Sequence, residues 1–589
     1  MRKFYKNLMM SVFAIVAICV MGFAFTACKS EDDPNTETPP VTTPDTTTPT
    51  TTPVEPEPVA PLVVTAKAKQ VGDEQRVRVY WESNEMLDEV YITLKHGNEI
   101  EKTMVIDDFG FTLNEELRGE EENSVVIETF YGRHTVEVVA KAGDRVSEKQ
   151  TKTVDVYTDE YNIAPLVATV PVSVYTLGMK NYTNNYEIST FFWLERSNQW
   201  DYTKLPDNVY PIPTATKAEI TSEYNTARDP KTVAWVKELY EINNDSKFNF
   251  YCNDYWPTVW LDAVYGNEIP VENFKITLLS DGTASYMMFN NVYNNADAAE
   301  TYAEYEALWE DYKEGAVTSL TTEQCRALVY VWVQDEDIDL TWVINRIDTI
   351  GQANDDVKNR ITELYASNTG RIRRYYLDQL WNALSDDEKA DLKALYHIGD
   401  VFAVAEEEEK IPMVILGTSD SGEGNDLGTY LSLVMEYYGD DYIYYYKGHP
   451  MYPTNANPTK QALLEELGIY ELESSIPAEF FYYFYPTVAY SGYGSSTFTN
   501  VGGDPSKAVF TRFETCDANY KDHLEIFISK LSDTDETYGD LVESGDTDKF
   551  LIQDKANLDE GVFTTIKIYD ATEKTFTTYN WVEDEYVVA

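Results

Sequence analysis

Hydrophobic and polar residues alternate with a period of two in several short stretches between residues 62 and 157. Such alternation places apolar side chains on one face of a strand and polar side chains on the other. The stretches cover residues 76–81, 89–94 and 134–140. Short strands at this spacing predict a small β-sandwich of the immunoglobulin type over residues 62–158, with Trp81 in its core. A spacer and a glycan-binding module both remain open as its role.

Beyond residue 165 the pattern changes, because short apolar runs alternate with stretches of helical period. The runs at 274–279, 412–416 and 441–446 predict buried strands. A helical stretch at 427–437 lies between the last two runs, and this βαβ order predicts a parallel sheet. We expect two Rossmann-like domains that face each other across a cleft, over residues 165–400 with a helical insertion and over residues 401–560.

The insertion, residues 296–395, is predicted to be mostly helical. Thr321 with Gln324, and Ser385 with Glu388, have the spacing of capping boxes at helix starts. Near the C-terminus, alternating segments at 563–568 and 576–581 flank a polar turn. This pattern predicts a β-hairpin tail over residues 561–589.

The N-terminus has the pattern of an export signal. Three cations in the first six residues precede an apolar run at 8–25, and the string Phe25-Thr26-Ala27-Cys28 resembles a lipobox. We therefore expect residues 1–27 to be a signal peptide and Cys28 to carry a lipid. A transmembrane anchor is the alternative, since the run is barely long enough to span a bilayer.

Residues 29–33 are Lys-Ser-Glu-Asp-Asp, which resembles a tag that sends lipoproteins to the outer face of the outer membrane. The tag favours the lipoprotein interpretation and display at the cell surface. Residues 28–61 are rich in Thr and Pro, a composition that cannot form a core and favours an extended stalk.

Composition limits the classes of function. A chain of 589 residues with 43% hydrophobic and 14% aromatic residues can form two or three cores. The net charge of −55 argues against nucleic acid and anionic lipid surfaces as partners. Beyond Cys28, only Cys252, Cys325 and Cys516 remain, which is no disulfide framework. These cysteines have no metal-ligand spacing, and with five histidines in the chain we expect no zinc site.

Three short motifs follow predicted strands, where ligands of open α/β sheets bind. They are Ser280-Asp281-Gly282, Lys447-Gly448-His449-Pro450 and Gly494-Ser495-Ser496. Each motif alone is weak, because Asp-Gly is a common turn, a lone loop histidine is often structural, and a serine often caps a helix.

Taken together and in this order, the motifs resemble the signature motifs of bacterial sialyltransferases of glycosyltransferase family 80, which have the two-domain GT-B fold. Neighbouring strings strengthen the resemblance, which spans residues 165–513: Gly417-Thr418, and Ser475-Ile476-Pro477-Ala478. Some members of that family also have a lipoprotein signal and an immunoglobulin-like domain in front.

The resemblance implies a role for each motif. Asp281 would be the general base that takes the proton from the acceptor hydroxyl, and His449 the general acid at the leaving phosphate. Ser495 and Ser496 would hold that phosphate. Transfer of sialic acid from CMP-sialic acid to a galactose-type glycan would be inverting and would need no metal or other cofactor. The remaining donor-binding residues would be Gly417, Thr418, Lys447, Gly448, Pro450, Ile476 and Pro477.

Lys447 is the nearest cation for the anionic donor, and an exposed lysine without a role is the alternative for its side chain. The chain also departs from the family at three places. Ser280 replaces the first of two acids, Phe481 and Tyr483 stand where a Ser and a Glu clamp the nucleotide, and residues 419–422 lack an aromatic residue that stacks on the acceptor. These departures leave open a rival function, a catalytically silent surface protein that binds glycans.

Overall fold

The structure of the protein is a computed structural model. It describes the chain from residue 60 onward, with gaps, so Cys28 and the rest of the predicted stalk up to residue 59 lie outside the described residues. Those residues are 60–107, 123–167, 188–194, 205, 208–213, 228–254, 257–266, 269–280, 283–344, 347, 350–351, 353–367, 370–374, 377–417, 427–449, 457–485, 488–492, 507–512, 549–554, 558–559, 562–563, 565–570, 573, 575–583 and 585–589.

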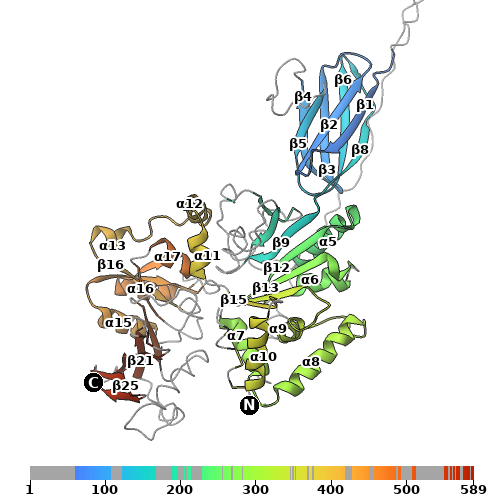
Figure 1. Ribbon diagram of the computed structural model, residues 1–589. Helices are drawn as coiled ribbons and strands as arrows, with labels where there is room; N and C mark the ends of the chain where they lie inside the picture. The colour runs from blue at the N-terminus through green and yellow to red at the C-terminus, as the bar shows by residue number, and fades with distance from the viewer. Residues whose placement is uncertain are drawn as a thin grey trace, which may run out of the picture. The chain divides into compact units, whose positions relative to one another are not determined.

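Two antiparallel sheets form the N-terminal β domain (Figure 1). Buried residues alternate with exposed or partly buried residues along the long strand β6, as a strand with one face on a core requires. Trp81 is 4% exposed and lies in the core, as predicted. A β domain is thus confirmed, while its immunoglobulin topology stays a prediction. One sheet contains β1 (Val64–Gln70), β2 (Arg76–Ser83) and β5 (Ser124–Glu128), and the other β3 (Glu89–His96), β4 (Glu99–Ile106), β6 (Gly132–Ala142), β7 (Arg145–Val146) and β8 (Gln150–Val156).

A seven-stranded, fully parallel sheet follows in the order β11-β10-β9-β12-β13-β14-β15. Its inner strands are buried almost continuously, as expected for a parallel sheet covered on both faces. Only residues 157–159 separate β8 from β9. The strands are β9 (Glu160–Val167), β10 (Thr190–Leu194), β11 (Val209–Pro211), β12 (Lys247–Asn253), β13 (Phe274–Leu279), β14 (Leu340–Ile344) and β15 (Ile372–Arg374).

Helices connect these strands, and both predicted capping boxes are confirmed at the starts of α9 and α12. The interval 296–395 is mostly helical, as predicted, but it also contains β14 and β15. α11 and α12 contact the helix at residues 478–484, which belongs to the second half of the chain: the Trp381 ring of α11 stacks on the Tyr483 ring at 5.0 Å, and Nζ of Lys393 in α12 lies 5.8 Å from the Phe484 ring centre. The helices are α5 (Arg228–Ile242), α6 (Thr258–Leu261), α7 (Thr283–Tyr293), α8 (Ala298–Lys313), α9 (Thr322–Trp332), α10 (Asp355–Ala366), α11 (Leu377–Ala383) and α12 (Asp386–Leu395), with single turns at Asp262–Gly266 and Val271–Asn273.

The second sheet has nine strands, in the order β18-β17-β16-β19-β20-β21-β24-β25-β26. It is parallel from β18 to β20 and antiparallel from β20 to β26. The predicted βαβ unit is confirmed as β16 (Ile411–Leu416), α15 (Leu427–Tyr438) and β17 (Tyr442–Lys447). The remaining elements are α13 (Ala403–Glu407), α16 (Pro458–Leu467), β18 (Tyr470–Leu472), α17 (Ala478–Phe484), β19 (Ala489–Gly492), β20 (Lys507–Arg512) and β21 (Lys549–Asp554), with a small pair β22 (Leu558–Asp559) and β23 (Val562–Phe563).

The predicted hairpin near the C-terminus is confirmed as β24 (Thr565–Asp570) paired with β25 (Thr575–Val582). It is not a separate appendage. β24 also pairs with β21, and β26 (Glu585–Val588) pairs with β25. The hairpin therefore extends the second sheet, because its strands satisfy the hydrogen-bonding edge that β21 would otherwise expose.

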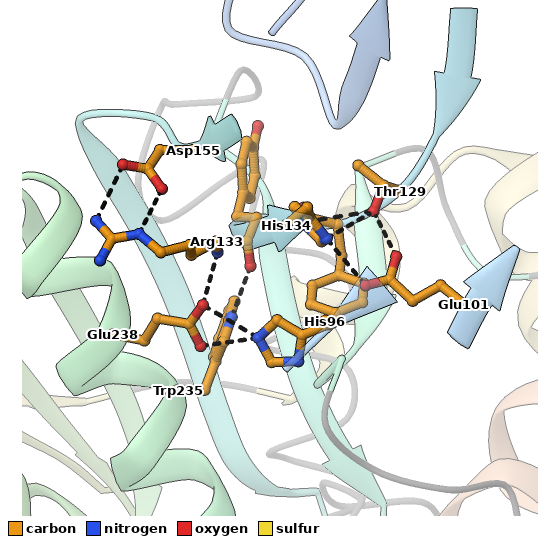
Figure 2. A network of polar contacts seen from close by, with 10 residues as sticks. His96, Glu101, Thr129, Arg133, His134, Asp155, Trp235 and Glu238 are labelled. Atoms are coloured by element: carbon orange, nitrogen blue, oxygen red, sulfur yellow. Dashed lines mark hydrogen bonds and ion pairs between the residues drawn. The ribbon is translucent and has the colours of Figure 1, made fainter. Parts of the chain in front are cut away.

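The β domain is bonded to the first α/β domain through α5 (Figure 2). Both carboxylate oxygens of Glu238 lie 2.9–3.0 Å from Nε2 of His96, and Oε1 accepts a hydrogen bond of 2.6 Å from the backbone N–H of Arg133. The indole N–H of the buried Trp235 donates to the carbonyl oxygen of Tyr131 at 2.8 Å. The Tyr131 ring also packs edge-on against Tyr161 of β9 at 5.4 Å.

A second histidine lies behind this contact, on β6. His134 is fully buried, with Nδ1 2.9 Å from a carboxylate oxygen of Glu101 and Nε2 2.8 Å from the carbonyl oxygen of Phe130. The hydroxyl of Thr129 donates to the other oxygen of Glu101 (Figure 2). We call residues 96, 101, 133, 134, 235 and 238 the histidine joint. It combines buried aromatic packing with hydrogen bonds to carboxylates, and through it the β domain contacts α5.

Candidate functional site

Three neighbouring parallel strands of the second sheet, β16, β17 and β19, lead into motif segments at their carboxyl ends. β16 pairs with β17 on one side and β19 on the other, and the register matches Leu416 with both Lys447 and Gly492. Gly417 follows β16 directly, and its N–H donates to the carbonyl oxygen of Lys447 at 2.9 Å. Three motif segments of the second half therefore start from one edge of one sheet, which is the edge where open α/β sheets bind ligands.

The first motif begins at the corresponding edge of the first sheet. β13 ends at Leu279, and the N–H of the buried Ser280 donates to the carbonyl oxygen of Val343 on β14 at 3.1 Å. Asp281 and Gly282 lie outside the described residues. The same is true of Thr418, Pro450, Ser495 and Ser496, so their predicted roles stay predictions.

His449 lies two residues beyond the end of β17 and is partly buried, while Gly448 is buried beside it. This position is compatible with the predicted acid, because a proton donor has to reach the leaving group directly or through one water.

The side chain of Lys447 is buried, so the alternative of an exposed lysine without a role is wrong. Lys447 is 3% exposed, and its Nζ donates to the carbonyl oxygens of Gly448 at 2.8 Å and Ser474 at 2.7 Å. Burial lowers the pKa of Lys447 to about 7, against the opposing influence of Glu479 and Glu473. The nitrogen is thus bonded to the protein backbone of two loops.

The loop before α17 supplies the next predicted residues. Ile476 is buried, and Pro477 occupies the N-cap position of α17. The two departures that follow have a structural consequence, because the Phe481 ring is fully buried and the Tyr483 ring stacks on Trp381. The Phe481 ring therefore belongs to the hydrophobic core, and the partly buried Tyr483 ring packs against that core.

A buried carboxylate that the sequence analysis did not identify lies beside the first motif. Asp254 follows β12, is 4% exposed, and its N–H donates to the carbonyl oxygen of Leu279 at the end of β13. One oxygen accepts from the hydroxyl of Ser285 in α7 at 2.5 Å, and the other accepts from the indole N–H of Trp342 in β14 at 2.9 Å. Asp254 thus holds both the strand that precedes residues 281–282 and the helix that follows them. The signal in the sequence is weak: a polar pair, Asn253-Asp254, after an apolar run.

Among the described residues, no group of three or more His, Cys, Asp or Glu side chains could hold a metal ion. A polar cavity lies at the amino ends of β13 and β14, where Glu272, Asp339, Arg360 and Arg371 line it. This cavity is at the opposite edge of the first sheet from residue 280, so it does not belong to the candidate site. In the part of the chain that the structure covers, no helix has the length and apolar character needed to cross a membrane.

Comparisons with known proteins find fold neighbours but no family. No family model matches the chain, and no curated protein matches it. A sialyltransferase from Photobacterium damsela is 14% identical, with a TM-score of 0.42 over 74% of this chain and 89% of that one. A 2,6-sialyltransferase from a Photobacterium species, solved with CMP and lactose, is 12% identical, with a TM-score of 0.46 over 74% and 86%.

A UDP-GlcNAc 2-epimerase from Neisseria meningitidis is 8% identical, with a TM-score of 0.33 over 66% of this chain and 90% of that one. This chain is itself a mixed α/β protein with one fully parallel sheet and one sheet that is parallel only from β18 to β20. Alignments with TM-scores below 0.5 and identities of 8–14% do not by themselves assign an activity to this chain.

Proposed function

We propose that the protein transfers sialic acid, or a related acidic sugar, from a CMP donor to a galactose-type hydroxyl of a glycan. The observation that carries the proposal is the order of the three motifs together with their positions in the chain. In the chain the motifs begin at residues 280, 447 and 494, and the strands before them, β13, β17 and β19, end at residues 279, 447 and 492. Chance occurrences of a turn, a loop histidine and a serine pair have no reason to fall only at carboxyl ends of strands.

The chemistry assigns one task to each motif. Asp281 accepts the proton of the acceptor hydroxyl as its oxygen attacks the anomeric carbon, and the bond from that carbon to the CMP phosphate breaks. His449 hydrogen-bonds the departing phosphate and donates a proton to it. Ser495 and Ser496 bind the same phosphate with hydroxyl and backbone donors. Such a single displacement inverts the anomeric centre.

The proposed setting is the cell surface, with the protein attached through a lipid on Cys28. CMP-sugars are made in the cytoplasm, so this setting favours the rival function, a glycan-binding protein without activity. Phe481 in the core and Tyr483 packed against it also favour the rival, since the Ser and the Glu expected to clamp the nucleotide are missing at these positions. A pair consisting of a base and an acid favours the enzyme, because glycan binding alone needs neither.

The experiment that tests the proposal is release of CMP from CMP-sialic acid by the purified protein, with and without lactose. We expect release that lactose accelerates, and a loss of ~10²–10⁴-fold in rate for Asp281→Asn and for His449→Ala. Asp339→Asn is the matched control, because Asp339 is exposed at the opposite end of the same sheet.

Three outcomes are distinct. No release of CMP, together with no binding of CMP in calorimetry, contradicts the transferase. Binding of sialylated or galactosylated glycans without turnover supports the rival. Full activity in both the Asp281 and His449 variants leaves the activity standing but contradicts the assigned mechanism.

A further inference from the structure

The Lys447 side chain does not have the position of a lysine that binds an anion from solution. Its nitrogen is buried at the end of β17, and it donates hydrogen bonds to two backbone carbonyl oxygens of the protein. A lysine that binds phosphate normally presents its ammonium group as a point charge to the ligand. The geometry therefore indicates a different task for this residue.

The two carbonyl groups belong to two different loops. Gly448 lies between Lys447 and His449, so a bond to its carbonyl oxygen fixes the peptide unit that leads into His449. Ser474 lies in the loop from β18 to α17 and precedes Ile476 and Pro477. β17 and β18 are parallel neighbours with Lys447 opposite Leu472, so both loops leave the same edge of the sheet.

Buried carbonyl groups need hydrogen-bond partners, because an unpaired buried polar group is costly. In this part of the structure the partner is a single side-chain nitrogen shared by both loops. Glu473 and Glu479 are the acidic groups whose charge acts on that nitrogen. Loss of the nitrogen would leave the Gly448 and Ser474 carbonyls without this donor and would let the two loops move independently.

We propose that Lys447 is a positioning residue, whose buried nitrogen ties the loop of His449 to the loop of Ile476 and Pro477 and so sets the direction of the imidazole. The inference deepens the proposed function and rests on it. It replaces direct contact between the Lys447 side chain and the donor, because the nitrogen acts on the reaction only through the two loops.

The test is a double-mutant cycle in the purified protein, with CMP release as the readout. Lys447→Met keeps the apolar stem and removes the donor, and we expect kcat to fall by about 10–100-fold, as displacements near 1 Å can cause. In a His449→Ala background the same substitution should change kcat by less than about threefold, because there is no longer an imidazole to position. Lys410→Met is the matched control, since the Lys410 side chain is 36% exposed and precedes the amino end of β16, opposite to the strand ends that carry the motifs.

Independent, multiplying losses in the two variants overturn the inference, because a side chain that contacts the donor directly would retain its effect without His449. Activity of Lys447→Met equal to that of Lys410→Met also overturns it. If Lys447→Met does not fold, Lys447→Gln replaces it in the double-mutant cycle, because Gln keeps N–H donors on a shorter side chain. The same two results then overturn the inference. A wild-type protein that releases no CMP contradicts the proposed function itself, and the inference then falls with it.

Discussion

Replacing Glu238 by Gln tests whether the histidine joint holds the β domain against α5. The substitution keeps an oxygen that can accept from the N–H of Arg133 but removes the charge that faces His96. Hydrogen bonds to charged groups contribute about 1.5–3 kcal/mol each when buried. The side chains of His96 and Glu238 are 24% and 25% exposed, so we expect a loss near the lower end of that range.

The loss should depend on pH, with a sign that follows from the two pKa shifts. The hydrogen bond to Glu238 raises the pKa of His96 above 6.5 against the effect of burial, and Glu101 and Glu99 add to the rise. Burial of Glu238 opposes its ionisation, but the hydrogen bonds from His96 and Arg133 outweigh this effect and lower its pKa below 4.5, with His134 adding to them.

The pair therefore contributes its full stability between about pH 4.5 and 6.5. This stability is lost as the pH rises through the raised pKa of His96, and as it falls through the lowered pKa of Glu238. The difference between wild type and Glu238→Gln should be largest near pH 5.5 and small at pH 9.

Amide hydrogen exchange followed by mass spectrometry reports this region directly, because β6 and α5 yield separate peptides. A loss of ~1.5 kcal/mol corresponds to roughly tenfold faster exchange after correction for intrinsic rates. Glu241→Gln removes the same charge from an exposed position on the same helix, and it should change exchange little. Equal exchange in the two variants at pH 5.5, or an equal loss at pH 5.5 and pH 9, would refute the reasoning.

Three further predictions follow from buried groups. Burial lowers the pKa of Lys447 in the folded protein to about 7, while in the unfolded chain the amine keeps its proton up to about pH 10. The free energy of unfolding of the wild type, relative to that of Lys447→Met, should therefore rise between pH 7 and 10, with a slope approaching ~1.4 kcal/mol per pH unit in urea unfolding. A flat difference would contradict a buried, titrating amine. Trp235→Phe removes the indole donor to Tyr131 and should cost about 1–3 kcal/mol in the same assay, whereas an unchanged midpoint would show that the contact is not needed. Phe481→Ser introduces the residue type that the sequence resemblance leads us to expect at this position. It should lower the melting temperature without improving CMP affinity in calorimetry, because Phe481 is fully buried. Tighter CMP binding would contradict its place in the core.

Local patterns in the sequence predicted the elements whose signals are local. Capping boxes at Thr321 and Ser385 depend on residues three positions apart, and both formed as expected. The strand Leu340–Ile344 was missed inside a helical interval, since five apolar residues do not distinguish a short strand from a helix. Pairing of the hairpin with β21 depends on residues far apart in the chain, which periodicity does not report.

The candidate site was predictable only where reactive residues stand in motifs. His449 and Gly417 were found because each follows a recognisable strand. Asp254 was missed because its partners, Ser285 and Trp342, come from two other elements and only the fold brings them together. Lys447 was identified, but its burial was not, because a lysine at a strand end is ordinarily exposed.

The three-residue connection between β8 and β9, residues 157–159, limits how the N-terminal β domain could be gained or lost by recombination. The chain leaves the antiparallel strand β8 and enters β9, which lies inside the parallel sheet between β10 and β12. A recombination point here would divide an aromatic cluster rather than fall in a solvated linker, since the ring of Tyr131 rests on that of Tyr161. The N-terminal β domain is therefore not an independent module that can be replaced by another domain at this point. It should be gained or lost in evolution only together with matching changes in β9 and α5.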